Sequence, residues 1–133
     1  VDAPLPDNVE TNGGRWDPMA IIRELRRASV FVMPSRCETW GDVFLEAMAY
    51  SLPCIGSSND AMPEIIQDGQ TGYIVPPDSP DVLADRICDL LPNPKKAQSF
   101  GSAGRRRVEE RYLWDDVIEQ MLPVLHGISL GGS

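Results

Sequence analysis

The sequence has 133 residues and a formal net charge of −8, with 42% hydrophobic and 24% charged residues. A chain of this length has room for one domain with its own core. The acidic balance argues against nucleic acid as a partner. No apolar run approaches the roughly 20 residues of a membrane span, and the amino terminus has neither the basic start nor the apolar core of a signal peptide.

The cysteine pattern favours a reducing compartment. Cys37, Cys54 and Cys88 cannot all pair within one chain, and their spacing matches no metal motif. We therefore expect reduced thiols and a cytoplasmic protein. Cys54 and Cys88 stand in apolar contexts and are predicted to be buried. The run 105–107 of three arginines is predicted to be a solvated helix face, and contact with an acidic membrane surface or partner is the alternative.

Local patterns predict strands that alternate with helices along the chain. Short apolar runs rich in β-branched residues are typical of buried parallel strands. A capping residue followed by proline marks a helix start, as at Asp17-Pro18. The predicted elements are a short strand at 9–12, a helix from Asp17, a strand at 30–34, a helix at 42–51, a strand at 54–57, a helix that ends at Gln67, a strand at 73–75, and helices at 79–91, 95–111 and 115–125. This alternation predicts an α/β fold, a parallel sheet of about four strands with helices on both faces.

The stretch from Glu38 to Tyr50 joins a predicted buried strand to a predicted buried helix. Gly41 allows a sharp turn, and Asp42 is a good helix cap. Such a junction lies at the carboxyl ends of the strands, where open α/β sheets bind ligands.

Two carboxylates occupy this stretch, Glu38 in the loop and Glu46 in the helix. Glu46 is the only polar side chain from Val43 to Ala49. Burial of a carboxylate on an apolar helix is costly unless a partner hydrogen-bonds it. A pair of ligand hydroxyls would be such a partner, and an arginine or backbone amides would be the alternative.

The sequence from Pro34 to Ala49, Pro-Ser-Arg-Cys-Glu-Thr-Trp-Gly-Asp-Val-Phe-Leu-Glu-Ala-Met-Ala, resembles the signature of glycosyltransferase family 4. These are retaining sugar-nucleotide transferases with a two-domain GT-B architecture. The resemblance runs from about Val9 to Leu122. The later motifs follow in the order of that family: Pro53-Cys-Ile-Gly56, Pro63-Glu64, Asp68-Gly69-Gln-Thr71-Gly72 and Tyr73-Ile-Val-Pro76.

The resemblance implies a Rossmann-like half of a GT-B fold, truncated at its N-terminal side. Residues 1–126 would be a partial C-terminal nucleotide-sugar-binding domain, and 127–133 are expected to be a flexible tail. The family's acceptor-binding N-terminal domain and the Arg and Lys that clamp the diphosphate are not in the sequence. The parent protein would transfer a sugar from a nucleotide diphosphate sugar to an acceptor, peripheral association with the inner membrane surface being one option. This chain alone is expected to lack turnover.

The resemblance also assigns roles to residues. Glu38 would be the catalytic-site residue that holds the transferred sugar through its hydroxyls. Glu46 would bind the ribose hydroxyls, and backbone amides would meet the diphosphate at a helix start. The expected donor-binding residues are Trp40, Gly41, Asp42, Val43, Phe44 and Glu46. Neither a metal nor a cofactor is expected, because amide dipoles and a basic pair neutralise the leaving group.

Two departures from the family pattern bear on donor binding. The Asp42 carboxylate is either a plain helix cap or a competitor for the amides that a phosphate would use. Asp60-Ala61 replaces the Gly-Gly pair that lets the backbone pass close to the sugar. These departures keep open an alternative function, a non-catalytic α/β interaction module that retains the fold without nucleotide-sugar chemistry.

The truncation predicts an unpaired sheet edge. In the doubly wound order 3-2-1-4-5-6, the strand at 9–12 would be the third and Val30–Met33 the fourth, with the two strands between them absent. The edge of Val30–Met33 would then be open to pairing. We expect either a homodimer built on that edge or a rearranged sheet.

Overall fold

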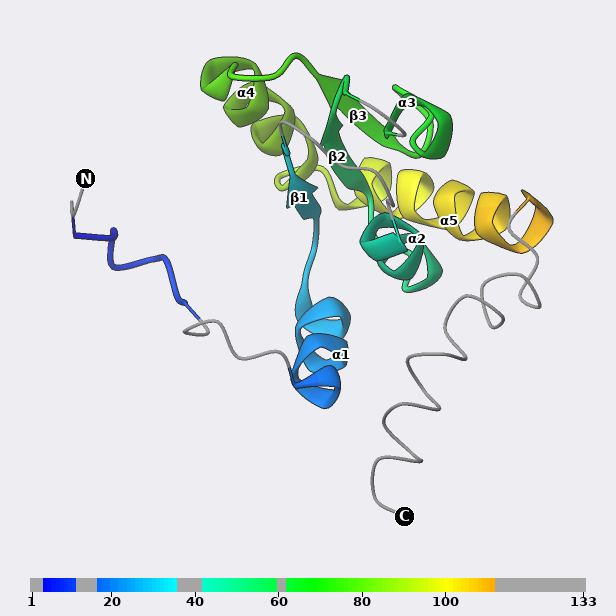
Figure 1. Cartoon of the computed structure of the whole chain (residues 1–133), viewed down its shortest axis with the longest axis horizontal. Helices are drawn as coiled ribbons and strands as arrows, with labels where there is room; N and C mark the ends of the chain where they lie inside the picture. Colours follow the sequence, from blue (N-terminus) through cyan, green and yellow to red (C-terminus); the bar gives the residue numbers. More distant parts are fainter. Residues whose placement is uncertain (1–3, 12–16, 36–41, 60–61, 112–133) are drawn as a thin grey trace.

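The computed structural model describes residues 4–11, 17–35, 42–59 and 62–111 (Figure 1). The predicted helix at 115–125 and the tail at 127–133 lie outside this part of the chain. In chain order the elements are α1 (Pro18–Arg27), β1 (Phe31–Met33), α2 (Asp42–Ala49), β2 (Cys54–Ser57), α3 (Met62–Ile65), β3 (Gly72–Val75), α4 (Pro80–Leu90) and α5 (Pro94–Arg111). The predicted alternation of strands and helices is confirmed across these residues.

The three strands form a parallel sheet in the order β1-β2-β3, with β2 in the centre. The register places side chains in rows across the sheet. One row holds Val32, Ile55 and Tyr73, and the next holds Met33, Gly56 and Ile74. Because side chains alternate along a strand, neighbouring rows belong to opposite faces of the sheet.

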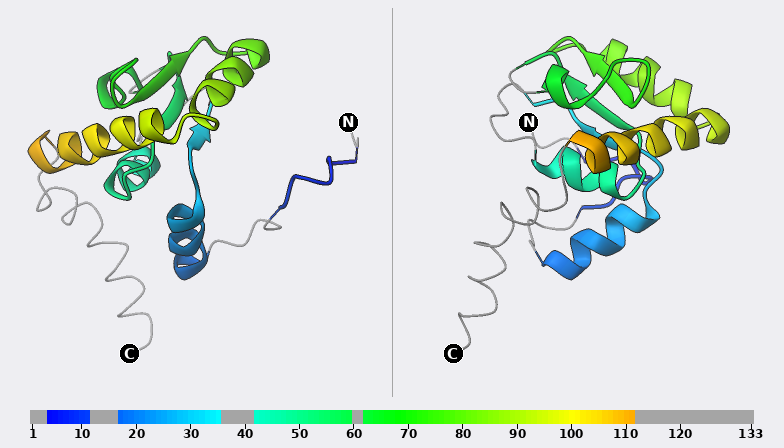
Figure 2. Two further views of the ribbon diagram at one scale, coloured as in Figure 1. Left: turned by 180° about the vertical axis from the view of Figure 1, so that it is seen from behind. Right: turned by 90° about the vertical axis from the view of Figure 1, so that its right-hand side faces the viewer.

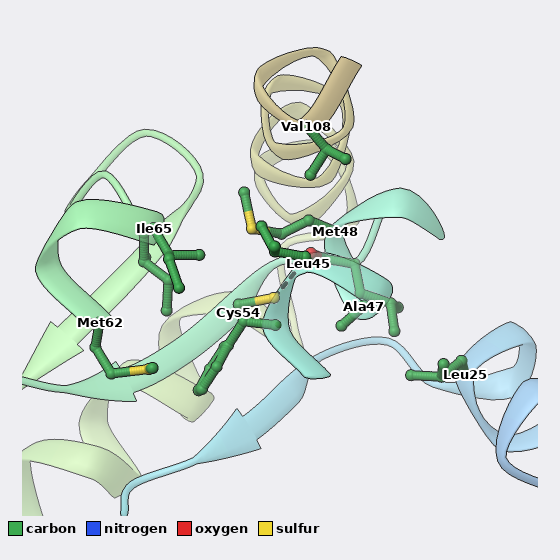
Figure 3. Packing of buried hydrophobic residues seen from close by; sticks show 11 residues of the cluster. Leu25, Leu45, Ala47, Met48, Cys54, Met62, Ile65 and Val108 are labelled. Carbon is green, nitrogen blue, oxygen red and sulfur yellow. Dashed lines mark hydrogen bonds between the residues drawn. The ribbon is translucent and has the colours of Figure 1, made fainter. Parts of the chain in front are cut away.

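Helices cover both faces of the sheet, as predicted, and two apolar clusters result. On one face Phe31 and Cys54 pack with residues of α1, α2 and α3. On the other face Ile55 and Tyr73 pack with Leu90 of α4. Figures 1 and 2 show α4 and α2 on opposite sides of the strands. Figure 3 shows the first cluster, in which α2, α3 and α5 converge around Cys54.

The prediction of a strand at 9–12 is wrong for its described residues. Residues 9–11 form no strand, and the sheet in the described part of the chain has three strands rather than about four. Val9 is the only apolar side chain of these three residues and is 46% exposed. Its N–H donates to the Pro6 carbonyl at 2.9 Å. A segment with one apolar side chain has no face to bury against a sheet.

Helix α5 packs closely against the C-terminal end of α2. A Cβ atom at Gly101 would lie 1.9 Å from the Ser51 carbonyl oxygen, so only glycine allows this approach. One helical turn later, Gly104 faces Met48 of α2. Ser51 comes three residues before β2 begins, so α5 passes the amino-terminal end of that strand, opposite the end at which ligands bind in such sheets.

The predicted burial is confirmed for Cys54 and wrong for Cys88. Cys54 is fully buried, and burial raises the pKa of its thiol to about 12. Cys88 is exposed, because α4 turns its Leu83, Ile87 and Leu90 side toward the sheet. A helix advances about 100° per residue, so the residue after Ile87 leaves that side.

In the part of the chain that the structure describes, no helix combines the length and the apolar character that a membrane crossing requires.

Candidate functional site

The carboxyl ends of β1, β2 and β3 share one edge of the sheet because the strands are parallel. We call this the carboxyl edge, the residues 34–35, 58–59 and 76–77 that follow the strands. The buried Ser57 hydroxyl donates to the Ser35 carbonyl at 2.5 Å. The Ser58 N–H donates to the Val75 carbonyl at 2.9 Å. The three strand ends are therefore tied to one another where a ligand would lie.

Helix α2 begins at this edge and is anchored by Phe44. The Phe44 side chain is fully buried, and its ring meets Phe31 of β1 edge-on, with centroids 5.3 Å apart. Leu45, Ala47 and Met48 of the same helix are also buried. The Phe44 side chain thus belongs to the core, and only its backbone is suited to ligand contact. The donor-binding role of the Phe44 backbone stays a prediction.

Two other predicted site residues of α2 are at least partly accessible. Val43 is 37% exposed. Glu46 is half-buried and already has an interaction partner. A ligand that binds Glu46 therefore has to exchange that interaction for its own hydrogen bonds.

The remaining predicted site residues are not placed by the structure. Glu38, Trp40 and Gly41 lie outside the described residues. Asp42 is the first residue of α2, and its side chain is not described. The structure therefore brings together Val43, Phe44 and Glu46 on one helix, while the relation of Glu38 to Glu46 stays a prediction.

Helix α3 follows β2 at the same edge of the sheet. The side chain of Arg107, in α5, binds the C-terminal end of α3. The Arg107 Nε donates to the Ile65 carbonyl at 3.0 Å, and Nη2 donates to the Glu64 carbonyl at 2.6 Å. Within the run of three arginines, Arg105 and Arg106 are exposed as predicted, whereas Arg107 is half-buried. The prediction of a solvated face is wrong for this one residue.

Two residues that shape the site were missed by sequence reasoning, Ser57 and Arg107. Each had a weak signal. Ser57 is a hydroxyl at the end of an apolar strand, where burial requires a partner. Gly104 and Val108 are buried on α5. Arg107 comes three residues after Gly104 and directly before Val108. A residue in this position borders the buried stripe of its helix.

A separate polar group lies on the opposite face of the sheet. The Tyr73 hydroxyl donates to Asp89, and Lys96 Nζ lies 2.6 Å from the same carboxylate. The hydrogen bond from Lys96, and then that from Tyr73, lowers the pKa of Asp89. The hydrogen bond to Asp89 raises the pKa of Lys96. This group joins β3, α4 and α5, so its role is to hold these elements together.

Metal coordination has no candidate among the residues that the structure describes: no group of three or more His, Cys, Asp or Glu side chains is placed to hold an ion.

Residues 2–107 match the sequence model of a family described as glycosyl transferases group 1. The chain is 38% identical over 119 residues to the alpha-maltose-1-phosphate synthase of Mycolicibacterium smegmatis, covering 84% of this chain and 31% of that protein. It is 34% identical over 134 residues to a GDP-mannose-dependent alpha-(1-6)-phosphatidylinositol monomannoside mannosyltransferase of Mycobacterium tuberculosis. This match covers 95% of this chain and 34% of that protein. The chain therefore spans about a third of the length of these curated relatives.

A solved structure shows the same similarity in three dimensions. The C-terminal domain of a glycosyl transferase group 1 family protein from Francisella tularensis is 32% identical, with a TM-score of 0.69. The match covers 75% of this chain and 51% of that one.

Proposed function

We propose a function from one premise: the chain belongs to the glycosyl transferases group 1 family. It forms the donor-binding portion of a retaining glycosyltransferase, which transfers a sugar from a nucleotide diphosphate sugar to an acceptor. Similarity to a GDP-mannose-dependent relative supports this donor class. The observation that carries the proposal is the half-buried Glu46 among the apolar residues 43–49 of a helix that starts at the carboxyl edge.

The start of α2 is the proposed diphosphate site. The first amide groups of a helix have no partner within the helix and attract anions. The backbone of Trp40, Gly41, Asp42, Val43 and Phe44 supplies these amides, and no metal is required. Asp42 is the first residue of α2 rather than the residue before it, so its carboxylate adds a second negative charge near these amides and weakens donor binding.

The two carboxylates bind the neutral parts of the donor. Glu46 accepts hydrogen bonds from the two ribose hydroxyls, because a carboxylate can accept a pair of them. Glu38 holds the transferred sugar through its hydroxyls. Turnover needs an acceptor and a second wall that closes the cleft against water, so this chain binds donor weakly and transfers nothing alone. The N-terminal acceptor domain of the parent protein supplies that wall.

Two further features belong to the proposal. The scattered cysteines, which we expect to be reduced thiols, support a cytoplasmic site of action. In isolation, the chain forms a homodimer through the outer edge of β1, which among the described residues pairs with β2 alone.

Heteronuclear NMR titration with UDP-glucose, GDP-mannose and ADP-glucose tests the donor site. We expect one nucleotide sugar to shift the amide signals of Val43, Phe44 and Glu46 while leaving α4 unchanged. The Glu46→Gln variant should bind that donor about tenfold or more weakly, since a hydrogen bond to a charged group contributes roughly 1.5–3 kcal/mol.

Glu110→Gln is the matched control, because Glu110 is exposed near the end of α5, and its affinity should equal that of the wild type. A Kd on the order of millimolar corresponds to a binding free energy of about −4 kcal/mol. If no donor shifts these signals at such concentrations, the donor-binding proposal is wrong. The chain would then fit the non-catalytic interaction module.

A further inference from the structure

Arg107 occupies a position that the proposed chemistry does not use. The two carbonyls that it binds belong to the last two residues of α3. Carbonyl groups at a helix end have no partner within the helix and need one elsewhere. Arg107 supplies it from 42 residues away. Its planar fork of donors suits two neighbouring carbonyls, which a lysine ammonium cannot bridge in the same way.

Helix α3, fixed in this way, packs against the start of α2. Ile65 belongs to the same apolar cluster as Phe44. Ile66, the residue after α3, and Phe44 belong to the same cluster, and both lie over Gly56 of β2. A Cβ atom at Gly56 would lie 3.0 Å from Ile66 Cδ1 and 3.2 Å from Phe44 Cζ. The two side chains share the space over Gly56, so a shift of α3 would disturb the packing of Phe44.

We propose that Arg107 is a positioning residue for the donor diphosphate. It fixes α3, and through Ile66 and Phe44 it fixes the amide groups at the start of α2. The inference rests on the proposed function of α2 as the diphosphate site. Gly101 and Gly104 press α5 against the other end of α2. Helix α5 therefore holds both helices from the side opposite the ligand.

The test compares Arg107→Lys with Arg106→Lys, two substitutions that keep the charge on neighbouring residues of one helix. Arg106 is exposed, and within the described part of the chain its side chain makes no hydrogen bond or ion pair, so its variant is the control. The measurements are the Val43 and Phe44 amide shifts of the free protein, the exchange rate of the Ile66 amide, the melting temperature, and the Kd for the nucleotide sugar that the wild type binds.

We expect Arg107→Lys to move the Val43 and Phe44 signals, to speed exchange of the Ile66 amide, and to raise the Kd about fivefold, a loss comparable to one hydrogen bond. Arg106→Lys should change none of these. A lower melting temperature with an unchanged Kd and unchanged Val43 and Phe44 signals would show a role in stability alone and overturn the proposal. A wild type that binds none of the three donors would instead refute the proposed function, and this inference with it.

Discussion

At the scale of single residues, Ser57 shows how a buried hydroxyl shapes the carboxyl edge. Its side chain is fully buried and donates to the Ser35 carbonyl, 22 residues earlier in the chain. Ser35 lies two residues after the end of β1 and is three residues before Glu38 in the sequence. The bond therefore fixes the chain where it leaves β1.

We expect Ser57→Ala to lower the free energy of unfolding by about 1–3 kcal/mol, because the Ser35 carbonyl loses its partner in a water-poor site. Urea denaturation measures the change, with Ser58→Ala as the control, since Ser58 is exposed and uses only its backbone N–H. Equal midpoints for the two variants would show that the hydroxyl contributes nothing to stability.

Sequence patterns placed residues well where local spacing decides the outcome. The burial of Phe44 and the partial accessibility of Glu46 follow from their positions on one helix. Arg107 and Ser57 depend on carbonyls 42 and 22 residues away. No local pattern encodes such partners, so these two contacts could not be predicted. The prediction that Cys88 is buried was wrong because apolar neighbours in sequence do not show which side of a helix faces the sheet.

At the scale of elements, Asp89 connects three of them. Its carboxylate accepts from Tyr73 of β3 and from Lys96 of α5, while Asp89 itself lies in α4. The guanidinium of Arg86 lies over the Tyr73 ring, 4.6 Å from its centroid. These polar contacts join α4 and α5 to β3 beside the apolar cluster that contains Ile55 and Tyr73.

This group predicts how stability depends on pH. The folded pKa of Asp89 is below its ordinary value of 3.8, so its contribution is present above that value and is lost as the pH falls through the folded pKa. The folded pKa of Lys96 is above 10.5, so its contribution is present below that value and is lost at higher pH. Thermal melts from pH 2 to pH 7 should therefore show that Asp89→Asn reduces the loss of stability in acid. Asp85→Asn, at an exposed position of α4, should leave the wild-type profile unchanged.

Most elements could be predicted because each has a local signal. Proline and capping residues mark the helix starts, an apolar run with two valines marks β1, and Pro53 precedes β2. The strand predicted at 9–12 failed because Val9 alone supplies no apolar face. A strand forms only where its side chains and its hydrogen bonds both find partners.

At the scale of the whole molecule, the outer edge of β1 is the place where we propose that a second copy of the chain pairs. The Phe31 N–H donates to the Pro53 carbonyl beside β2 at 3.0 Å. Successive N–H groups of a strand point to alternate sides, so the Val32 N–H points to the outer edge. Among the described residues no strand pairs there.

Sedimentation velocity over a range of concentrations should detect the proposed dimer. Val32→Pro removes an N–H from the outer edge without removing a bond to β2, and it should shift the chain to monomer. Circular dichroism of the variant shows whether the fold is kept. A wild type that stays monomeric at every concentration would contradict pairing through β1.

Helix α5 has one more consequence, for the way the chain unfolds. Phe100 near its start belongs to the cluster on one face of the sheet, and Val108 near its end belongs to the cluster on the other. Loss of α5 would open both clusters at once. Neither face can then melt as an independent cooperative unit, and fluorescence and amide exchange should report a single transition for the whole sheet.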